Sequence, residues 1–429
     1  MRSVYSLAGL SGVLAFALSA CTLASGVAEE VFPSPVAYVP AEAPPQPTAT
    51  PTLAPLPTPT VLPTSVPRPL PQDTTAAIGL WSDRLVDAAG WPGFLDVAQG
   101  EAALDYRAAR NNALIALGGG QLYSAPPEQL AELQRTRPNW LLYDSKGRVA
   151  LASADQRSPL LDIRSAEVRE YLAQRVAEVL SEKPWDGIVL SGVGEDLIRP
   201  TASPIFTGTR PFTSDQRRDA VEGLLRAVRA RVPDKLIIIG GYAWKDGQAY
   251  TANANAARLL ATLADGVHVE HFLRHPVSKT NEFKSEAAWK QDVDYLSLIS
   301  QNDQIVLITT RLSASNVSPE IVQQWMRYAV ASYLLGKNGA RTYFQLDAGD
   351  PVYLADPYFN APVGAPIEPY VKLSNGLYAR RFQNGLVLVN PSAQKKTAKL
   401  DGSYRTLSGT SVEESVTMGP QTGLILLRR

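Results

Sequence analysis

From Ala76 onward, short apolar runs alternate with longer stretches in which apolar and polar residues mix. Short and mostly apolar runs are typical of parallel strands that are covered on both faces. Eight runs predict strands: Ile78–Trp81, Ala113–Leu117, Trp140–Tyr143, Gly187–Leu190, Leu236–Ile239, Gly266–Val269, Ile305–Ile308 and Thr342–Leu346.

The stretches between these runs have helical spacing. Apolar residues recur every three or four positions from Val168 to Leu180, and again from Val221 to Val232 after a candidate cap at Ser214. Ser318-Pro319-Glu320 combines a capping hydroxyl, a first-turn proline and an early acid, which predicts a helix start. Strands alternating with helices predict an α/β fold, a (β/α)8 TIM barrel.

A doubly wound open sheet is the alternative fold. Its dinucleotide-binding version loses support, because no G-x-G-x-x-G follows the first strand. We interpret Gly118-Gly119-Gly120 as a flexible loop.

The last part of the chain has a different pattern. Shorter β-type runs occupy Gly376–Phe382, Gly385–Val389, Lys396–Leu400 and Gly423–Leu427, and Asn384-Gly385 is a tight-hairpin signal. We therefore predict a barrel domain over 76–365 and a small antiparallel, sandwich-like β domain over 366–429.

The first 75 residues resemble a secretion signal and a spacer. Arg2 precedes an apolar run from Val4 to Leu18, and Leu18-Ser19-Ala20-Cys21 resembles the lipobox of bacterial lipoproteins. The resemblance implies that a signal peptide, 1–20, is removed and that Cys21 is lipidated, which would anchor the protein on the outer face of a bacterial cell membrane. The alternative is a free cysteine that happens to follow an apolar stretch.

The segment 21–75 is expected to be a Pro/Thr-rich disordered linker. Fourteen of the 41 residues in 31–71 are proline, which favours extended polyproline II and a spacer. The alternative is a stalk glycosylated on its threonines.

Composition excludes several partners. Lys plus Arg (41) balances Asp plus Glu (41), so there is no excess of base to neutralise nucleic-acid phosphates or a membrane surface. A single cysteine excludes a disulfide framework and a cysteine zinc site. We expect no nucleic acid partner, no cofactor, and no membrane contact beyond the lipid anchor.

Several motifs together resemble barrel-type glycoside hydrolases, and more narrowly the extracellular glycoside-hydrolase-like families. They are Trp140-Leu-Leu-Tyr-Asp-Ser-Lys-Gly147, Leu161-Asp-Ile-Arg164, Trp185-Asp-Gly-Ile-Val-Leu190, Asp265-Gly-Val-His-Val-Glu270 and Tyr378–Pro391. The resemblance spans roughly Ile78 to Leu427. It implies a barrel with a closing β domain, and a polysaccharide or oligosaccharide as the partner.

The chain departs from that family pattern at two strand ends. Ser191 stands where the family usually has an aspartate, and Ile239-Gly240-Gly241 follow Leu236–Ile238, where an asparagine is common in the family. Serine does not replace a carboxylate opposite an oxocarbenium-like transition state. Either Glu195 or Asp196 takes over that role, or catalysis has been lost.

Glycoside hydrolysis usually needs two carboxyl groups, and barrel active sites lie at the carboxyl ends of the strands. We expect Glu270 to be the catalytic acid or base, with a partner from Glu195, Asp196 or Asp347. The alternatives for Glu270 are a polar sugar ligand or an ion pair with Arg274. The candidate substrate-binding residues are Trp81, Asp144, Asp162, Ser191, Tyr242, Trp244, His268 and His271.

Each candidate binding residue also has a structural alternative. Asp144 and Asp162 are also suited to capping or pairing, and the aromatic side chains to the core. His268, His271 and His275 are the only histidines, and their spacing invites a metal interpretation. On a strand, however, His268 and Glu270 share one face and His271 takes the other, so we expect no metal.

The sequence thus favours a glycoside hydrolase acting on an extracellular polysaccharide by carboxylate acid/base catalysis. A non-catalytic carbohydrate-binding barrel that lost its aspartate at Ser191 is the first alternative. A stalked structural or adhesion lipoprotein is the second.

Overall fold

A computed structural model describes residues 78–85, 94–121, 123–144, 146–152, 157–191, 206–207, 210–211, 214–240, 263–274, 278–279, 281–301, 304–312, 317–348 and 356–429. Several predictions fall outside these residues and stay predictions: the lipid anchor at Cys21, the linker, and the roles of Glu195, Asp196, Tyr242, Trp244 and His275.

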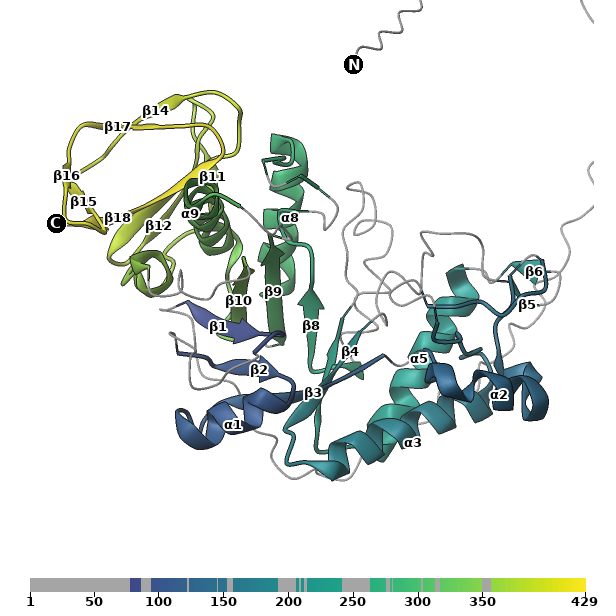
Figure 1. The fold of residues 1–429 in the computed structure, drawn as a ribbon. Helices are drawn as coiled ribbons and strands as arrows, with labels where there is room; N and C mark the ends of the chain where they lie inside the picture. Colours follow the sequence, from purple (N-terminus) through teal and green to yellow (C-terminus); the bar gives the residue numbers. More distant parts are fainter. Residues whose placement is uncertain are drawn as a thin grey trace, which may run out of the picture. The chain divides into compact units, whose positions relative to one another are not determined.

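Eight parallel strands close into a barrel in the order β1-β10-β9-β8-β7-β4-β3-β2 (Figure 1). The strands are β1 (Gly79–Ser82), β2 (Val97–Gln99), β3 (Ile115–Gln121), β4 (Gly187–Ser191), β7 (Leu236–Ile239), β8 (Gly266–Val269), β9 (Ile305–Arg311) and β10 (Thr342–Asp347). The predicted TIM barrel is confirmed, and the open-sheet alternative is excluded because β1 pairs with both β2 and β10.

One strand prediction was wrong, and one barrel strand was not predicted. Trp140 ends a 3-10 helix, η2 (Pro138–Trp140), and Leu141 and Tyr143 form isolated bridges to Leu161 and Val149, so this run lies outside the barrel. The strand that was not predicted is β2, which pairs with β1 and β3, and its three residues are too few to give a periodic signal.

Gly118-Gly119-Gly120 is also not a loop, because it lies inside β3. A Cβ on Gly119 would lie 2.4 Å from Nε2 of Gln99 on the neighbouring strand β2. The glycine therefore makes room for a glutamine side chain that crosses the strand.

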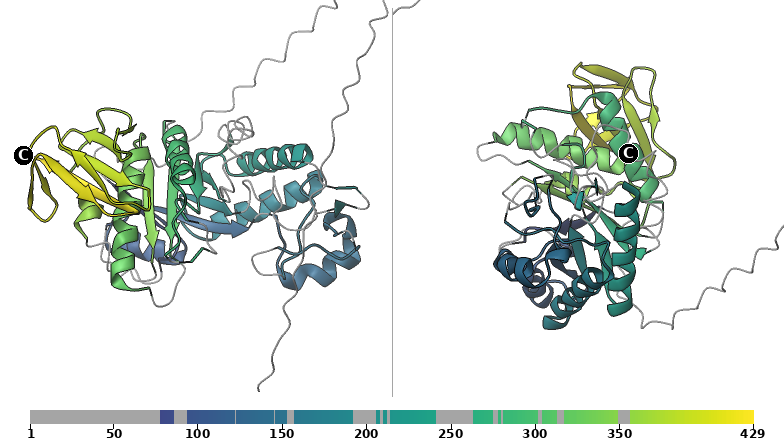
Figure 2. Two further views of the ribbon diagram at one scale, coloured as in Figure 1. Left: turned by 90° about the horizontal axis from the view of Figure 1, so that it is seen from above. Right: turned by 90° about the vertical axis from the view of Figure 1, so that its right-hand side faces the viewer.

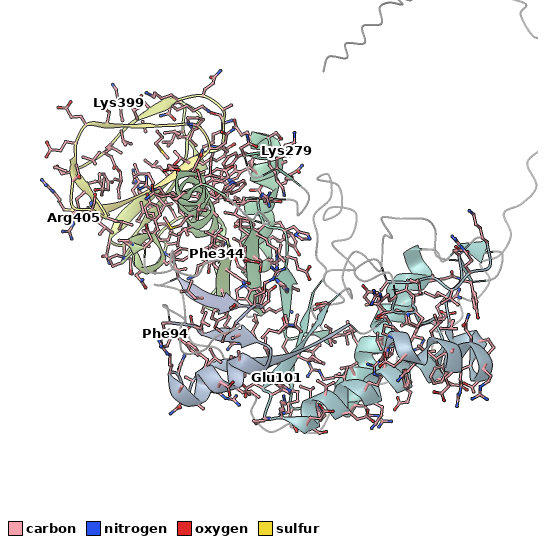
Figure 3. All side chains as sticks on the ribbon, in the orientation of Figure 1. Phe94, Glu101, Lys279, Phe344, Lys399 and Arg405 are labelled. Carbon is pink, nitrogen blue, oxygen red and sulfur yellow. The ribbon has the colours of Figure 1, made fainter. Side chains whose placement is uncertain are left out.

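The barrel strands bury alternate residues on two sides. One apolar cluster takes alternate strand residues and fills the interior: Trp81, Val97, Ile115, Leu117, Val189, Leu236, Ile238, Ile305, Leu307 and Tyr343. The residues between them pack outward against helices. Phe344, labelled in Figure 3, is one of these, and its ring lies 5.0 Å from that of Tyr333.

Six α-helices are described: α1 (Glu101–Ala109), α2 (Leu130–Thr136), α3 (Ala166–Glu182), α5 (Ser214–Arg231), α8 (Glu286–Ile299) and α9 (Pro319–Gly336). The helix starts predicted at Ser214 and after Ser318 agree with α5 and α9. Helices α3 and α5 lie side by side (Figure 2). No helix in the described part of the chain is long and apolar enough to cross a membrane.

Aspartates close the amino-terminal face of the barrel. Asp96, Asp186 and Asp265 each precede a strand, and each accepts the backbone N–H of a residue on the adjacent strand, at 2.8 Å. These carboxylates therefore hold adjacent strands in register. They lie at the face of the barrel opposite to the carboxyl ends of the strands, where barrel active sites form.

The C-terminal region forms separate antiparallel sheets, as predicted. A six-stranded sheet has the order β11-β12-β13-β18-β15-β16, and β14 pairs with β17. The strands are β11 (Val371–Lys372), β12 (Tyr378–Phe382), β13 (Gly385–Asn390), β14 (Lys396–Lys399), β15 (Tyr404–Thr406), β16 (Ser411–Val412), β17 (Ser415–Met418) and β18 (Thr422–Arg428). The Asn384-Gly385 signal marks the β12–β13 hairpin, where Phe382 pairs with Gly385.

The remaining short elements are the hairpin of β5 (Phe206–Thr207) with β6 (Arg210–Pro211), and the 3-10 helices η1 (Pro127–Gln129) and η4 (Pro357–Asn360).

Candidate active site

The inward-facing side chains turn from apolar to polar toward the carboxyl ends of the strands. On β9, Ile305 and Leu307 are followed at the same alternation by Thr309 and Arg311. On the neighbouring β10, Tyr343 is followed by Gln345 and Asp347. Because barrel active sites form at this end, the polar layer marks the candidate site.

A charged network links three adjacent strands in this layer. The Arg311 guanidinium lies 2.6 Å from Oδ2 of Asp83, just after β1, and 3.1 Å from Oδ2 of Asp347 on β10. Gln345 Nε2 donates to Asp83 Oδ1 at 3.0 Å, and the exposed Arg84 lies 3.2 Å from Asp347. The side chains of Asp83 and Arg311 are mostly buried, so their attraction is screened less than a surface pair would be.

The environment of Asp83 keeps it ionised. Burial alone would raise the pKa of this carboxyl. The nearby Arg311 charge, His268, and hydrogen bonds from Arg311 and Gln345 outweigh burial, and together they lower the pKa below its usual value.

Glu270 lies directly after β8, and its carboxylate reaches across to the neighbouring strand β7. A Cβ on Gly240, which follows β7, would lie 3.2 Å from Oε1 of Glu270 and 3.3 Å from Cα of Ser191. Glu270 and Ser191 thus flank the same glycine, and the structure brings together the two departures from the family pattern. The Glu270 side chain is 28% exposed, which leaves it partly accessible to a ligand.

His268 lies one alternation below Glu270, on β8, and is 3% exposed. Its Nδ1 is 3.8 Å from Glu270 Oε1, and its Nε2 is 3.0 Å from the Thr309 hydroxyl. Burial lowers the pKa of His268 to about 3, although Asp83 acts in the opposite direction. The imidazole is therefore neutral at physiological pH.

The turn after β8 is pinned to two neighbours. Leu273 adopts a left-handed conformation (φ 64°) that is unfavourable for a non-glycine residue. Its N–H donates to Asp292 of α8 at 2.8 Å, and Arg274 donates to the backbone carbonyl of Arg311 at 2.6 Å. Strained backbone of this kind persists only when its surroundings fix it, and here it follows Glu270 by three residues.

Other candidate binding residues have structural partners. Trp81 is 1% exposed, and its ring N–H donates to the carbonyl of Ile308, so it belongs to the core and offers no face to a sugar. Asp144 accepts the backbone N–H groups of Lys146 and Arg148 in a turn. Asp162 forms a two-point pair with Arg164.

His271, half-buried in the turn after β8, is close enough for its charge to act on the pKa of His268. Within the described ranges, no group of three or more His, Cys, Asp or Glu side chains is placed to hold a metal ion.

Sequence reasoning missed four residues of the polar layer: Asp83, Thr309, Arg311 and Gln345. The alternation of side chains along a strand was a usable signal. These four residues lie two or four positions after the inward-facing Trp81, Leu307 and Tyr343, and therefore point to the same side of the strand.

The family is decided by a sequence comparison. Residues 116–386 match the model of a family described as hypothetical glycosyl hydrolase family 15. The chain belongs to this family. The matched segment includes Ser191, Gly240 and Glu270, and it ends within the β domain.

The chain is distantly similar to solved structures that include a glycoside hydrolase domain and an α-amylase. The glycoside hydrolase domain of PelA from Pseudomonas aeruginosa is 14% identical, with 65% of this chain and 97% of that chain covered, and a TM-score of 0.42. A maltogenic α-amylase, AmyB, from Thermotoga neapolitana is 11% identical, with coverage of 82% and 99% and a TM-score of 0.49. No residue correspondence follows from similarity at this level. A comparison with curated proteins gave no match.

Proposed function

We propose that this member of hypothetical glycosyl hydrolase family 15 is a glycoside hydrolase that acts on an extracellular polysaccharide, with Glu270 as its acid/base. The observation that carries the proposal is the Glu270 carboxyl, which is partly exposed at the carboxyl end of β8 beside a buried polar layer. A carboxyl group in this position is suited to protonating a glycosidic oxygen.

The second carboxylate of the mechanism is proposed among Glu195, Asp196 and Asp347. Asp347 already faces Arg311 and Arg84, so its charge is partly neutralised by ion pairs. Glu195 and Asp196 follow β4 on the chain, and β4 ends beside Glu270 at Ser191. We favour Glu195 or Asp196 as the source of the second carboxylate.

The proposed location is outside the cytoplasm, with a lipid on Cys21 and the proline-rich segment as a spacer. The lipobox-like sequence supports this assignment. A long tether would allow the barrel to reach a large polysaccharide, which matches the proposed substrate class.

The test is release of reducing ends from a panel of soluble and insoluble polysaccharides by the wild-type protein and by Glu270→Gln. We expect the variant to lose at least about 100-fold in turnover, because general acid/base catalysis contributes on that order or more. Glu182→Gln, at the exposed end of α3, is the matched control and should retain full turnover. Equal turnover by wild type and Glu270→Gln would overturn the assignment.

A carbohydrate-binding barrel without turnover is the second candidate, favoured by Ser191 at the strand end that flanks Gly240. It predicts saturable polysaccharide binding by wild type with no reducing-end release. In that case Ser191→Asp is expected to create measurable hydrolysis, because it adds a carboxylate near Glu270. Neither binding nor turnover on the panel would favour the structural or adhesion alternative.

A further inference from the structure

A chain of hydrogen bonds leads from Asp83 to His268. The orientation of the Gln345 side-chain amide determines which group donates and which accepts in each of these bonds. The Gln345 amide oxygen accepts the backbone N–H of Asp83 at 3.3 Å, while its Nε2 donates to Asp83 Oδ1 at 3.0 Å. An ionised carboxylate accepts hydrogen bonds and cannot donate them. The amide therefore has only one orientation that satisfies both contacts, with its oxygen toward β9.

The Thr309 hydroxyl takes its direction from that amide oxygen. Thr309 Oγ1 lies 3.3 Å from Gln345 Oε1, which is an acceptor only, so the hydroxyl proton points to Gln345. Thr309 is fully buried. Its oxygen is then left to accept from His268 Nε2 at 3.0 Å.

This polarity determines the tautomer of His268. A neutral imidazole carries one proton, and the Thr309 contact holds it on Nε2. Nδ1 is left as a lone pair that has no hydrogen-bond partner among the described residues, and it faces Glu270 Oε1 at 3.8 Å.

We infer that His268 is a positioning residue, whose unprotonated Nδ1 accepts a hydrogen bond from the Glu270 carboxylic acid and disfavours the carboxylate, so that the proton stays on Glu270 until it passes to the glycosidic oxygen. The inference deepens the proposed function and rests on it for the role of Glu270. A carboxylate oxygen facing this lone pair would be repelled, whereas the protonated carboxyl is attracted. The separation is longer than a hydrogen bond, and contacts of this kind are often long in a structure without substrate.

The charges around His268 are consistent with a neutral ring. Asp83 after β1 and Arg311 on β9 act on it with opposite signs and neutralise each other through their ion pair. His271 and Glu270 approach from the turn after β8. The uncharged Trp81 ring also packs against His268, nearly perpendicular to it and 4.5 Å away between centroids.

The first test is the tautomer itself, measured by imidazole 15N NMR on the full chain, whose three histidines give a simple spectrum. We expect His268 in the wild type to carry its proton on Nε2 and to stay neutral from pH 5 to pH 8. Thr309→Val removes the acceptor at nearly constant volume and should shift population to the Nδ1–H tautomer. Thr309→Ser keeps the hydroxyl and should restore the wild-type spectrum. A wild-type ring protonated on Nδ1 would overturn the inference.

The second test is the titration of the Glu270 side chain, followed by carboxyl 13C NMR and assigned by the signal lost in Glu270→Gln. With Nδ1–H as a donor, the carboxylate form is favoured, so Thr309→Val should lower the pKa of Glu270 by about one unit. An unchanged titration in a folded Thr309→Val protein would contradict the inference.

Both measurements are independent of turnover, so the two proposals fail separately. If the tautomer and titration are as expected but no polysaccharide is hydrolysed, only the proposed function fails. If turnover depends on Glu270 but the tautomer is reversed, only the inference fails. Where turnover is measured, the alkaline limb of kcat/KM should move to lower pH in Thr309→Val and return in Thr309→Ser.

Discussion

At the scale of single residues, Gly240 creates the space that Glu270 occupies. The added Cβ of Gly240→Ala would sit 3.2 Å from Glu270 Oε1 and 3.3 Å from the Cα of Ser191, which is tighter than ordinary contact. We expect the carboxyl to be displaced by a few tenths of an ångström, with turnover lowered about tenfold while KM and Tm change little. Steady-state kinetics with thermal unfolding would check this. Gly419→Ala, where a Cβ meets nothing within 4 Å, is the control.

Asp83 carries a prediction about pH. Its pKa is lowered in the folded protein, so it stabilises the fold at pH values above its unfolded pKa, and that contribution is lost as pH falls through the folded pKa. Asp83→Asn leaves Arg311 with Asp347 alone and should cost about 2 kcal/mol of unfolding free energy at pH 7. The difference from wild type should shrink below about pH 4.

Urea unfolding at pH 7, 5, 4 and 3 would measure that difference. Asp144→Asn is the control, because the pKa of Asp144 is also lowered, mainly by hydrogen bonds from Arg148, but in a site open to water. A deficit for Asp83→Asn that stays constant across this pH range would mean that its charge is not the source of the stabilisation.

Part of the candidate site was predictable residue by residue. The shared face of His268 and Glu270 follows from strand alternation, and the structure brings their side chains together. Asp83, Thr309 and Gln345 were missed, because their partners are contributed by other strands that only barrel closure brings close. Sequence alone does not give the register between distant strands.

At the scale of elements, the turn after β8 depends on helix α8. Asp292 accepts the N–H of the strained Leu273 and pairs with Lys284 at 2.6 Å, with its own side chain almost fully buried. Asp292→Asn would leave the mostly buried Lys284 without its counter-charge. We expect a loss of about 2 kcal/mol in unfolding free energy and a lower kcat, because the turn that follows Glu270 loosens.

Denaturant unfolding and kinetics of Asp292→Asn would be compared with Glu222→Gln, which removes a surface pair with Arg226 on α5. Surface pairs contribute at most about 1 kcal/mol. If Asp292→Asn lowered stability but left kcat unchanged, the turn would be a structural feature with no part in positioning Glu270.

The elements themselves were mostly predictable, and the exceptions have physical causes. Long apolar runs and helical spacing gave the right positions for β9, β10, α3 and α9, although Ser318 makes no side-chain capping hydrogen bond at the start of α9. The run Trp140–Tyr143 is as apolar as a barrel strand, but Leu142 packs in a local cluster with Ala152 and Leu160, while Trp140 and Leu141 join the main apolar core without forming a barrel strand. Strand β2 has only three residues, and it forms because it pairs with the neighbouring strands β1 and β3. That pairing leaves no pattern in the local sequence from which β2 could be predicted.

At the scale of the whole described unit, Arg380 of β12 joins the C-terminal sheet to the barrel helices. Its guanidinium donates to the backbone carbonyls of Leu334, Leu335 and Lys337 at the end of α9, and to the side chain of Asn338. A helix end has carbonyls without intrahelical partners, and a buried arginine satisfies several of them at once. Burial lowers the pKa of Arg380 to about 10, so the group is still charged at pH 7.

Removing this contact should uncouple the sheet from the barrel. Arg380→Ala leaves buried carbonyls unsatisfied and should cost about 3 kcal/mol. All seven tryptophans precede residue 366, so tryptophan fluorescence reports mainly on the barrel, with Trp289 also in ring contact with Tyr378 of β12, whereas far-UV circular dichroism follows both parts. We expect the two urea transitions to coincide in wild type and in the control Arg405→Ala, an exposed arginine of the same sheet (Figure 3), and to separate in Arg380→Ala. Coincident transitions in Arg380→Ala would show that the apolar contact of α9 with β13 and β18 is enough to couple the two parts.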